Sequence, residues 1–378
     1  MVSRRGTLRL LVGKKLAFRR GKTTPPASRA QCVSHQTPMI IRTTAYPRAA
    51  LIGNPSDGYF GKTIAFAFRN FSANIELWES PELELLPSRR DHSVFKGLKA
   101  LHQDVKLHGY YGGFRLLKAA AKAFYDYSVE RGIELDEKNY TMRYRSDIPN
   151  RVGLAGSSAL ITACMRALMS FYEVSISRHS LANLVLRVEN QELSIPAGLQ
   201  DRVAQSYQGL VFMDFDRKLM ENRGYGEYEM LDPTLLPPVF VAYREDLSEG
   251  TEVYHNDLRA RWLRGEPDVL EAIQFWAELT VTFRKAMESG DLTSMHRMLN
   301  ANFDKRASLY DVGDGNRDLI HTARRTGASA QFCGSGGAIV GIYEDEAMFT
   351  RIEQAFAPKG IRVIKPDFAP GLSTGELP

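Results

Sequence analysis

Two short stretches of the sequence combine glycines with hydroxyl groups in patterns that could bind phosphate. The first, GNPSDGYFGKT at residues 53–63, ends like a P-loop, which needs a glycine, four further residues and then Gly-Lys-Ser/Thr. That spacing requires a glycine where the sequence has Ser56. Residues 63–79 are aromatic, β-branched and roughly alternating, which predicts strands and not the helix that follows a P-loop. The P-loop interpretation is therefore disfavoured.

The second stretch, IPNRVGLAGSSALITACMRAL at residues 148–168, meets the chemical requirements better. Gly153 and Gly156 would let the main chain approach an anion without a side chain in the way. Ser157 and Ser158 fall where an apolar helix is predicted to begin, and the free N–H groups and positive dipole of that end attract an anion. Hydroxyl groups there could also reach a Mg²⁺ ion that bridges two phosphates. A capping serine with packing glycines is the alternative that these residues leave open.

The elements around these stretches predict an α+β protein. In the first half, strands are predicted within 41–86, 139–147 and 208–215, and helices at 92–106, 112–132, up to about 172, and 178–192. The second half predicts a strand at PPVFVAYRE, helices across 254–326, two strands around the glycine turn of ASAQFCGSGGAIVGIY, a helix and a strand near 360–364. Because the strict alternation of a doubly wound sheet is missing, we expect two α+β layers. Breaks at 224–238 predict domains at 41–230 and 231–378.

The net charge of +5 comes from the amino-terminal segment. Nine of the 49 Lys and Arg residues and none of the 44 Asp and Glu residues lie in residues 1–40, so the rest of the chain is slightly acidic. This leader resembles an organelle transit peptide, although a disordered tail or a misassigned start codon explains it equally well. No basic and aromatic pattern continues into the body, and no apolar run approaches the roughly 20 residues of a membrane helix. We therefore expect neither nucleic acid nor a membrane as a partner.

The cysteines and histidines show no metal-ligand spacing. Cys32, Cys164 and Cys333 cannot all pair, and the last two lie in apolar surroundings typical of buried residues in a reducing compartment. The eight histidines are scattered, so a zinc site is not expected.

The second stretch carries a family resemblance. PNRVGLAGSSA is similar to the Pro-x-x-x-Gly-Leu-x-(Gly/Ser)-Ser-Ser-Ala motif of the GHMP kinases, a superfamily named for galactokinase, homoserine kinase, mevalonate kinase and phosphomevalonate kinase. YPRAALIGNPSDGYFGKT resembles the first motif of these kinases, which faces the sugar, although the glycine before Arg48 is absent and Asn54-Pro55 replaces Glu-His. FCGSGGAIVGIY at 332–343 resembles their third motif, a glycine turn that closes against the phosphate loop.

A narrower resemblance comes from the Asn-Pro-Ser-Asp form of the first motif. Together with GYYGGFRLL, GLQDRVAQSYQGLVFMDF and ARRTGASAQFCGSGGA, it closely resembles the plant-type glucuronokinases over nearly all of residues 44–366. The resemblance implies two domains, an N-terminal α+β domain with the phosphate loop and a C-terminal α+β ferredoxin-like domain. It also implies ATP-dependent, Mg²⁺-assisted phosphorylation of the anomeric hydroxyl of D-glucuronate, which would feed UDP-glucuronate synthesis.

Alternatives remain open at this point. Another sugar kinase of the superfamily, for galactose, arabinose or a heptose, would share these motifs, as would a catalytically silent sugar-binding protein. The expected partners are a sugar acid and ATP, and the sequence carries no signal for an oligomeric state. Relatives of this type are expected in the cytoplasm, or in a plastid or mitochondrion if the leader is a transit peptide.

The resemblance also assigns roles to residues. The predicted nucleotide-binding residues are Gly153, Leu154, Ala155, Gly156, Ser157, Ser158 and Ala159. Ser158 and Glu189 are predicted to hold Mg²⁺, and Asp201 and Arg48 to be catalytic. The predicted substrate-binding residues are Asn54, Asp57, Lys62, Gly334, Ser335 and Gly336.

A uronate also needs a cation for its carboxylate, preferably an arginine. The candidates are Lys62, Arg202 and Arg306. Lys62 is favoured because it follows the turn that contains Asp57, which would give the Gly-Lys-Thr triplet a sugar-acid contact instead of a nucleotide.

Overall fold

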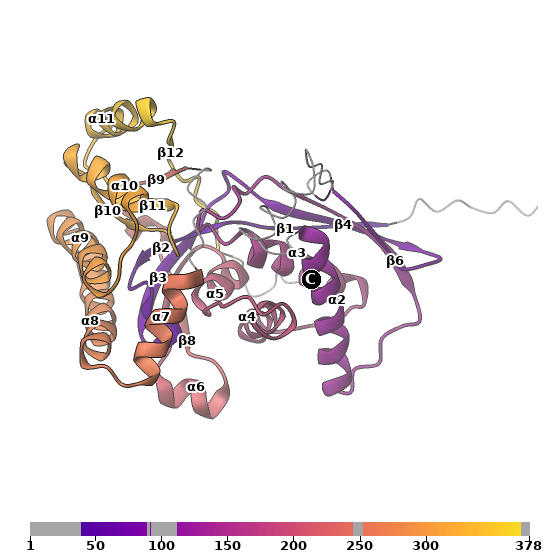
Figure 1. Cartoon of the computed structure of the whole chain (residues 1–378). Helices are drawn as coiled ribbons and strands as arrows, with labels where there is room; N and C mark the ends of the chain where they lie inside the picture. Colours follow the sequence, from indigo (N-terminus) through magenta and orange to yellow (C-terminus); the bar gives the residue numbers. More distant parts are fainter. Residues whose placement is uncertain (1–38, 89–90, 92–111, 245–251, 372–378) are drawn as a thin grey trace, which may run out of the picture. The chain divides into compact units, whose positions relative to one another are not determined.

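A computed structural model describes residues 39–88, 91, 112–244 and 252–371 (Figure 1). The helix predicted at 92–106, Cys32 and almost all of the basic leader lie outside these residues. Within the described part of the chain, no helix is both long and apolar enough to cross a membrane.

The first of three four-stranded sheets supports the predicted phosphate loop. Its strands, in the order β1-β4-β6-β5, are β1 (Ile40–Ala45), β4 (Ala73–Ser80), β6 (Asn139–Ser146) and β5 (Glu84–Leu86). Helices α2 (Gly113–Glu130) and α3 (Gly156–Phe171) pack together, and α3 also packs on β1 and β4. β4 alternates buried and part-exposed residues, which is the expected pattern of a strand with one covered face.

The second sheet contains the stretch that resembles the first GHMP-kinase motif. Its antiparallel strands, in the order β2-β3-β7-β8, are β2 (Arg48–Ile52), β3 (Lys62–Ala67), β7 (Leu210–Asp214) and β8 (Glu227–Leu231). Figure 1 shows α8 (Pro267–Ser289) on one side of β2 and β3 and α5 (Gln200–Tyr207) on the other. β2 is buried along its whole length because both faces are covered.

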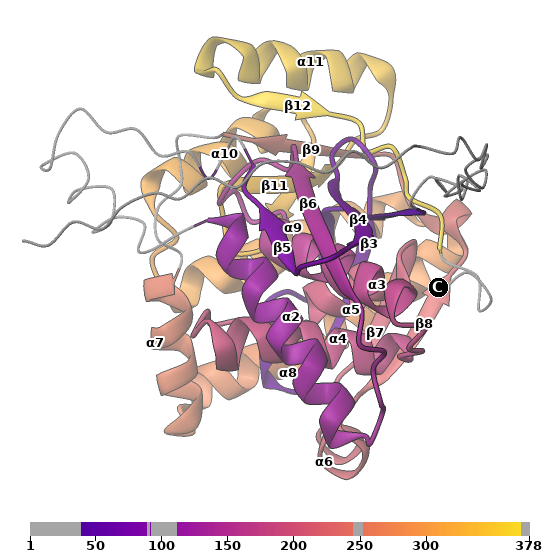
Figure 2. The ribbon, with the colours of Figure 1, turned by 90° about the vertical axis from the view of Figure 1, so that its right-hand side faces the viewer.

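The third sheet is built by the C-terminal part of the chain. Its antiparallel strands, in the order β10-β11-β9-β12, are β10 (Ser329–Phe332), β11 (Ala338–Ile342), β9 (Val239–Tyr243) and β12 (Arg362–Ile364). Its helices are α9 (Leu292–Leu309), α10 (Asp314–Arg325) and α11 (Glu346–Phe356), and Figure 2 shows α11 above β12. The β-α-β-β-α-β order is that of a ferredoxin-like unit, so the expected two-domain α+β fold is confirmed.

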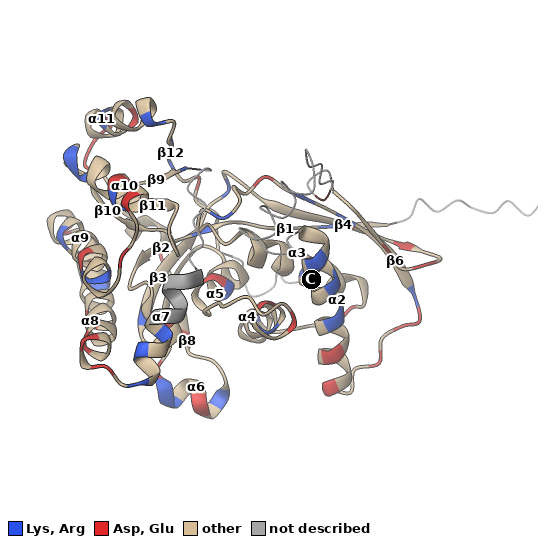
Figure 3. Ribbon diagram, in the orientation of Figure 1, with Lys and Arg blue, Asp and Glu red and all other residues tan. Residues whose placement is uncertain are grey.

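Three further α-helices lie within the described residues. They are α4 (Arg178–Arg187), α6 (Arg217–Arg223) and α7 (Glu252–Leu263). Figure 3 shows basic and acidic residues mixed along α8 and α9. Cys164 and Cys333 are buried and unpaired, as expected, and burial raises the pKa of each thiol to about 12.

A buried polar network fixes the first motif against the C-terminal elements. Asn302 of α9 accepts a hydrogen bond from the Gly53 main-chain N–H (2.8 Å) and donates to the Asn54 carbonyl (3.0 Å). It also donates to Gln331 of β10 (3.0 Å), whose amide donates in turn to the Ala50 carbonyl (2.7 Å). Because these groups have no access to water, their pairing strongly favours this one arrangement.

Candidate active site

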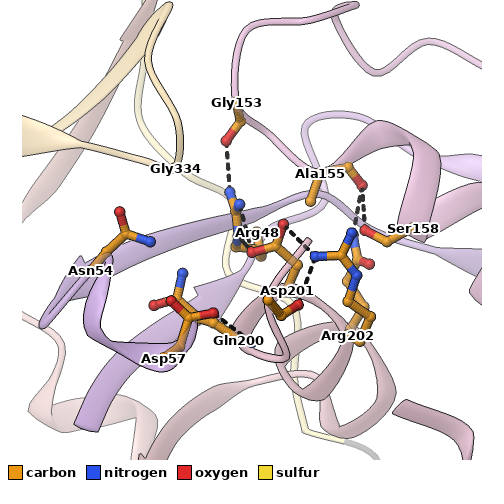
Figure 4. Close-up of polar contacts among 12 residues, drawn as sticks. Arg48, Asn54, Asp57, Gly153, Ala155, Ser158, Gln200, Asp201, Arg202 and Gly334 are labelled. Atoms are coloured by element: carbon orange, nitrogen blue, oxygen red, sulfur yellow. Dashed lines mark hydrogen bonds and ion pairs between the residues drawn. The ribbon is translucent and has the colours of Figure 1, made fainter. Parts of the chain in front are cut away.

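Arg48 and Asp201 form the centre of the site (Figure 4). Arg48 begins β2, and its Nε and Nη2 both lie 2.6 Å from Oδ1 of Asp201, which is in the first turn of α5. Its Nη1 donates to the carbonyl of Gly153 in the predicted phosphate loop, also at 2.6 Å. The Asp201 side chain is 19% exposed and that of Arg48 only 4%, so Asp201 is the more accessible of the two.

Arg202 extends this pair to Glu189. Its Nη1 lies 3.1 Å from the second oxygen of Asp201, and its Nε donates to Glu189 Oε2 at 2.5 Å. Glu189 is fully buried in a π-helical turn, η3 (Val188–Glu192), that follows α4. The hydroxyl of Ser157 donates to the other oxygen of Glu189 at 2.6 Å. Arg202 therefore lies between two carboxylates, Glu189 and Asp201, and Ser157 connects Glu189 to the predicted phosphate loop.

The two arginines determine the charge of Asp201. Burial alone would raise the pKa of its carboxyl, but Arg48 and Arg202 outweigh burial, and the pKa lies below its usual value. Asp201 is therefore ionised at neutral pH and can accept a hydrogen bond or a proton.

Asp57 behaves in the opposite way. It lies in a short 3₁₀ turn, η1 (Ser56–Tyr59), and accepts a hydrogen bond from the main-chain N–H of Gln200 (3.2 Å). Burial, and next the nearby charge of Asp201, raise its pKa to about 6, although Gln200, Arg202 and Arg48 act against this. Two carboxyl groups with divergent pKa values therefore lie in one site.

The predicted phosphate loop forms a tight turn into α3. Ala155 adopts a left-handed conformation with φ of 61°, and α3 begins at Gly156. Ser158 is fully buried and donates to the Ala155 carbonyl (3.2 Å), which also accepts a hydrogen bond from Gln205 of α5 (2.9 Å). Of the two motif serines, it is Ser157 that contacts Glu189.

The glycine turn after β10 lies against this loop. A Cβ atom on Gly334 would come within 2.5 Å of the Gly153 carbonyl and 2.7 Å of Arg48 Nη2. A Cβ atom on Gly153 would come within 2.7 Å of the Gly336 carbonyl and 3.2 Å of the Ser335 nitrogen. Only glycine allows so close an approach of these two main-chain segments.

The predicted sugar-binding residues fall into two groups. Asn54 accepts a hydrogen bond from Arg306 Nη1 at 2.9 Å, and Asp57 contacts Gln200 beside Asp201. Lys62 instead forms an ion pair with Asp214, its neighbour across β3 and β7. Within the described residues, no hydrogen bond or ion pair joins Lys62 to the Arg48–Asp201 pair.

Sequence reasoning missed residues that support this site. A Cβ atom on Gly198 would come within 2.2 Å of Asp57 Oδ2, so this glycine leaves space for the carboxyl group. Gly198 opens the GLQD segment that contains Asp201, but its role is visible only once Asp57 is placed beside it. Asn302 and Gln205 hold the two motif turns. Asn302 carried no motif signal, and Gln205 lies in the quoted segment GLQDRVAQSYQGLVFMDF, where no role was assigned to it.

Comparison with known proteins gives this geometry a family context. The profile of the GHMP kinases N terminal domain matches residues 115–209, and that of the GHMP kinases C terminal domain matches residues 283–359. Two Arabidopsis thaliana proteins are similar in sequence. "Probable glucuronokinase 2" is 42% identical over 80% of this chain and 84% of its own length, and "Glucuronokinase 1" is 38% identical over 81% and 85%. The chain belongs to the glucuronokinase family of GHMP kinases.

A solved structure has a similar fold. The galactokinase of Lactococcus lactis, solved in complex with galactose, superposes with a TM-score of 0.68 and 17% identity, covering 88% of this chain and 94% of its own. As a member of the glucuronokinase family, the chain is a sugar kinase, and it uses ATP.

The site contains oxygen donors that suit a Mg²⁺ ion. Glu189 supplies a buried carboxylate, whose two oxygens accept hydrogen bonds from Ser157 and Arg202 and keep further lone pairs. The Ser158 hydroxyl donates to the Ala155 carbonyl, so its own oxygen keeps lone pairs for a cation. Mg²⁺ prefers oxygen ligands and is usually held by one or two carboxylates together with phosphate groups and water. Among the described residues, no cluster of three or more His, Cys, Asp or Glu could form an all-protein metal site. The donor set therefore fits an ion that arrives with a nucleotide.

Proposed function

We propose that the chain transfers the γ-phosphoryl group of ATP to the anomeric hydroxyl of D-glucuronate, giving D-glucuronate 1-phosphate and ADP. The observation that carries this proposal is the Arg48–Asp201 pair, which is joined to the Gly153 carbonyl of the phosphate loop. The choice of glucuronate is supported by the 42% and 38% identity to the two Arabidopsis relatives. The product is a sugar 1-phosphate of the kind that precedes UDP-glucuronate.

Asp201 is the acceptor for the proton of the sugar hydroxyl. Its carboxylate is ionised and partly exposed, whereas its arginine partners are buried. The anomeric oxygen forms a bond to the γ-phosphorus while the bond from that phosphorus to the β,γ-bridging oxygen breaks. The hydroxyl proton passes to Asp201, and ADP leaves with the bonding electrons. An anomeric hydroxyl is more acidic than an ordinary alcohol, so a carboxylate is a sufficient base.

Arg48 holds Asp201 in position and keeps it ionised. Its three nitrogens are all directed to the two parts that must meet in the reaction, the base and the phosphate loop. A fixed positive charge at this point also stabilises negative charge that develops on the transferred group. Lysine could not reproduce this fork of donors.

The nucleotide is held by the turn from Gly153 to Ala159, whose free N–H groups at the start of α3 face the phosphates. Ser158 and Glu189 would hold Mg²⁺, which neutralises phosphate charge when it is bound. Ser157 orients Glu189 through its 2.6 Å hydrogen bond. Arg202, which shares Glu189 and Asp201, keeps the metal ligand and the base at a fixed separation.

The sugar is bound by the first and third motifs. Asn54 and Asp57 offer groups for its ring hydroxyls, and the main chain of Gly334, Ser335 and Gly336 closes over the phosphate loop. Asp57 with a pKa of about 6 can donate or accept a hydrogen bond near neutral pH.

A coupled assay for ADP release, run with D-glucuronate, D-galactose, L-arabinose and a heptose side by side, tests the proposal. We expect glucuronate to give the highest kcat/KM, and ³¹P NMR of the product to identify an anomeric phosphate. A higher kcat/KM for another of these sugars would identify that sugar as the preferred substrate in place of glucuronate. Sugar binding by calorimetry without any ADP release would instead indicate a silent sugar-binding protein.

A further inference from the structure

Arg306 is a buried arginine at the edge of the proposed sugar site. It lies in the last turn of α9 and is 1% exposed. Its Nη1 donates to the side-chain oxygen of Asn54 and to the carbonyl of Gly334, both at 2.9 Å, and its Nε contacts the Tyr310 hydroxyl. Asn54 and Gly334 belong to the first and third motifs, and Figure 4 draws both of them around the Arg48–Asp201 pair.

The pKa of Tyr59 responds to both Asp57 and Arg306. Burial raises the pKa of the Tyr59 phenol, and the charge of Asp57 and then Tyr310 raise it further, whereas Arg259 and Arg306 lower it. Tyr59 therefore lies within electrostatic range of both Asp57 and Arg306. The guanidinium group itself contacts Asn54, one of the residues proposed to hold the sugar.

Among the described residues, Arg306 forms no ion pair with an acidic side chain, unlike the other two candidate cations, Lys62 and Arg202. Lys62 is paired with Asp214, and Arg202 with Glu189 and Asp201. Among the described residues no carboxylate forms an ion pair with Arg306, and its Nη2 is buried without a hydrogen-bond partner. A buried charge without an opposite charge is costly, so a site of this kind gains most from an anion.

We propose that Arg306 binds the carboxylate of the sugar acid and so makes the enzyme specific for a uronate. This inference rests on the proposed function, because it names the residue that distinguishes glucuronate from a neutral hexose. The carboxylate would accept a charge-assisted hydrogen bond from Nη2, while Nη1 stays fixed by Asn54 and Gly334. Lys62, which the sequence favoured for this role, would keep its partner Asp214.

Arg166 provides a matched control. It is also buried, at 5% exposure, and forms no ion pair with an acid of the described residues; it donates instead to main-chain carbonyls of Thr44, Gln205 and Ser206. Burial, followed by the charge of Arg178, lowers the pKa of Arg166 to about 10. It does not contact Asn54 or Gly334, so its loss should affect stability without affecting the recognition of the sugar.

The test compares D-glucuronate with D-glucuronamide, which replaces only the carboxylate by a neutral amide. The ratio of the two kcat/KM values is measured for the wild type, Arg306→Gln and Arg166→Gln. Loss of hydrogen bonds to a charged group is expected to lower the preference for glucuronate between about 10- and 100-fold in Arg306→Gln. The KM for ATP should stay within about threefold, and Arg166→Gln should keep the wild-type preference.

An unchanged preference in a folded Arg306→Gln protein would overturn the inference while leaving the proposed function intact. If that variant does not fold, Arg306→Met removes the charge with a flexible apolar side chain, and a preference equal to the wild type would overturn the inference equally well. Lys62→Met tests the alternative that Lys62 binds the carboxylate. If Lys62→Met loses the preference for glucuronate and Arg306→Gln keeps it, Lys62 is the carboxylate-binding residue. A wild-type protein that phosphorylates neutral sugars but not glucuronate would contradict the proposed function itself.

Discussion

Arg48 contacts Asp201 through two nitrogens at 2.6 Å each, although 152 residues separate them in the chain. The third nitrogen of Arg48 is bonded to the phosphate loop, so the position of the proposed base is tied to the position of the nucleotide. Phosphoryl transfer depends on such alignment, because the attacking oxygen, the phosphorus and the leaving oxygen must be roughly in line.

Asp201→Asn should remove the proton acceptor while keeping the shape of the side chain. We expect kcat to fall between about 10² and 10⁴-fold, the usual contribution of a general base. Steady-state kinetics with saturating ATP and sugar measure this loss, and a thermal melt checks that the variant is folded. A kcat within threefold of the wild type would show that Asp201 neither accepts the proton nor aligns the hydroxyl.

Arg48→Lys should change the pH profile as well as the rate. Arg48 helps to lower the pKa of Asp201, so a weaker contact lets that pKa rise toward its usual value. Activity requires the ionised form, and the acid limb of the kcat/KM profile should therefore move to higher pH. A lower rate with an unmoved acid limb would mean that Arg48 acts on the phosphoryl group alone.

Ionised Asp57 is expected to lower the stability of the folded protein, although this residue is proposed to bind the sugar. Its pKa is raised from 3.8 to about 6, so the folded state keeps a proton that the unfolded chain releases. The stability of the ligand-free protein should therefore fall as the pH rises from about 4 to 7, by about 1–3 kcal/mol from this group. Asp57→Asn should remove this loss and melt at a higher temperature than the wild type at pH 7.5.

The same substitution should impair catalysis. Asparagine retains an acceptor for the Gln200 N–H but cannot ionise, so kcat/KM for the sugar should fall at least tenfold. Melting curves from pH 5 to 8 and kinetics at pH 7.5 are both needed. A lower melting temperature for the variant at pH 7.5 would contradict the proposed cost of ionising Asp57.

The two motif serines should differ in their effect on Mg²⁺. Ser158→Ala removes a proposed ligand, and we expect the Mg²⁺ concentration for half-maximal activity to rise about tenfold or more. Ser157→Ala removes one hydrogen bond that orients Glu189, so the rise should be smaller, about threefold. Titration of activity with Mg²⁺ at constant ATP separates the two. The reverse order would assign the metal to Ser157, the serine that touches Glu189 in the structure.

The fold could be predicted from the sequence where the periodicity was strong. Alternation at 139–147 predicted β6, and the glycine turn at ASAQFCGSGGAIVGIY predicted the β10–β11 pair. The helix predicted at 178–192 covers two elements in the structure: α4, which ends at Arg187, and the π-helical turn that follows it. Propensities hardly distinguish an α- from a π-turn, and such turns often occur at functional sites, which agrees with the position of Glu189.

Residues of the candidate site were proposed from the sequence only where a motif named them. The resemblance pointed to Arg48, Asp201 and Ser157, and the structure brings them into one network. The partners within that network depend on contacts between distant segments, such as Lys62 with Asp214, which local pattern cannot predict. For the same reason the sequence ranked Lys62 above Arg306, since only the structure reveals which cation already has an acid.

Gly334→Ala should separate the two turns that meet at Arg48. The added Cβ atom would come within 2.5 Å of the Gly153 carbonyl and 2.7 Å of Arg48 Nη2, so one of these groups must move. Because Arg48 positions Asp201, we expect kcat to fall at least tenfold. The variant should lose more activity than stability, and a melting curve measures the latter. Gly58→Ala is the matched control, since a Cβ atom there meets nothing within 4 Å and its kinetics should match the wild type. Wild-type kinetics for Gly334→Ala would mean that Arg48 tolerates displacement, and that its bond to the phosphate loop does not align the reaction.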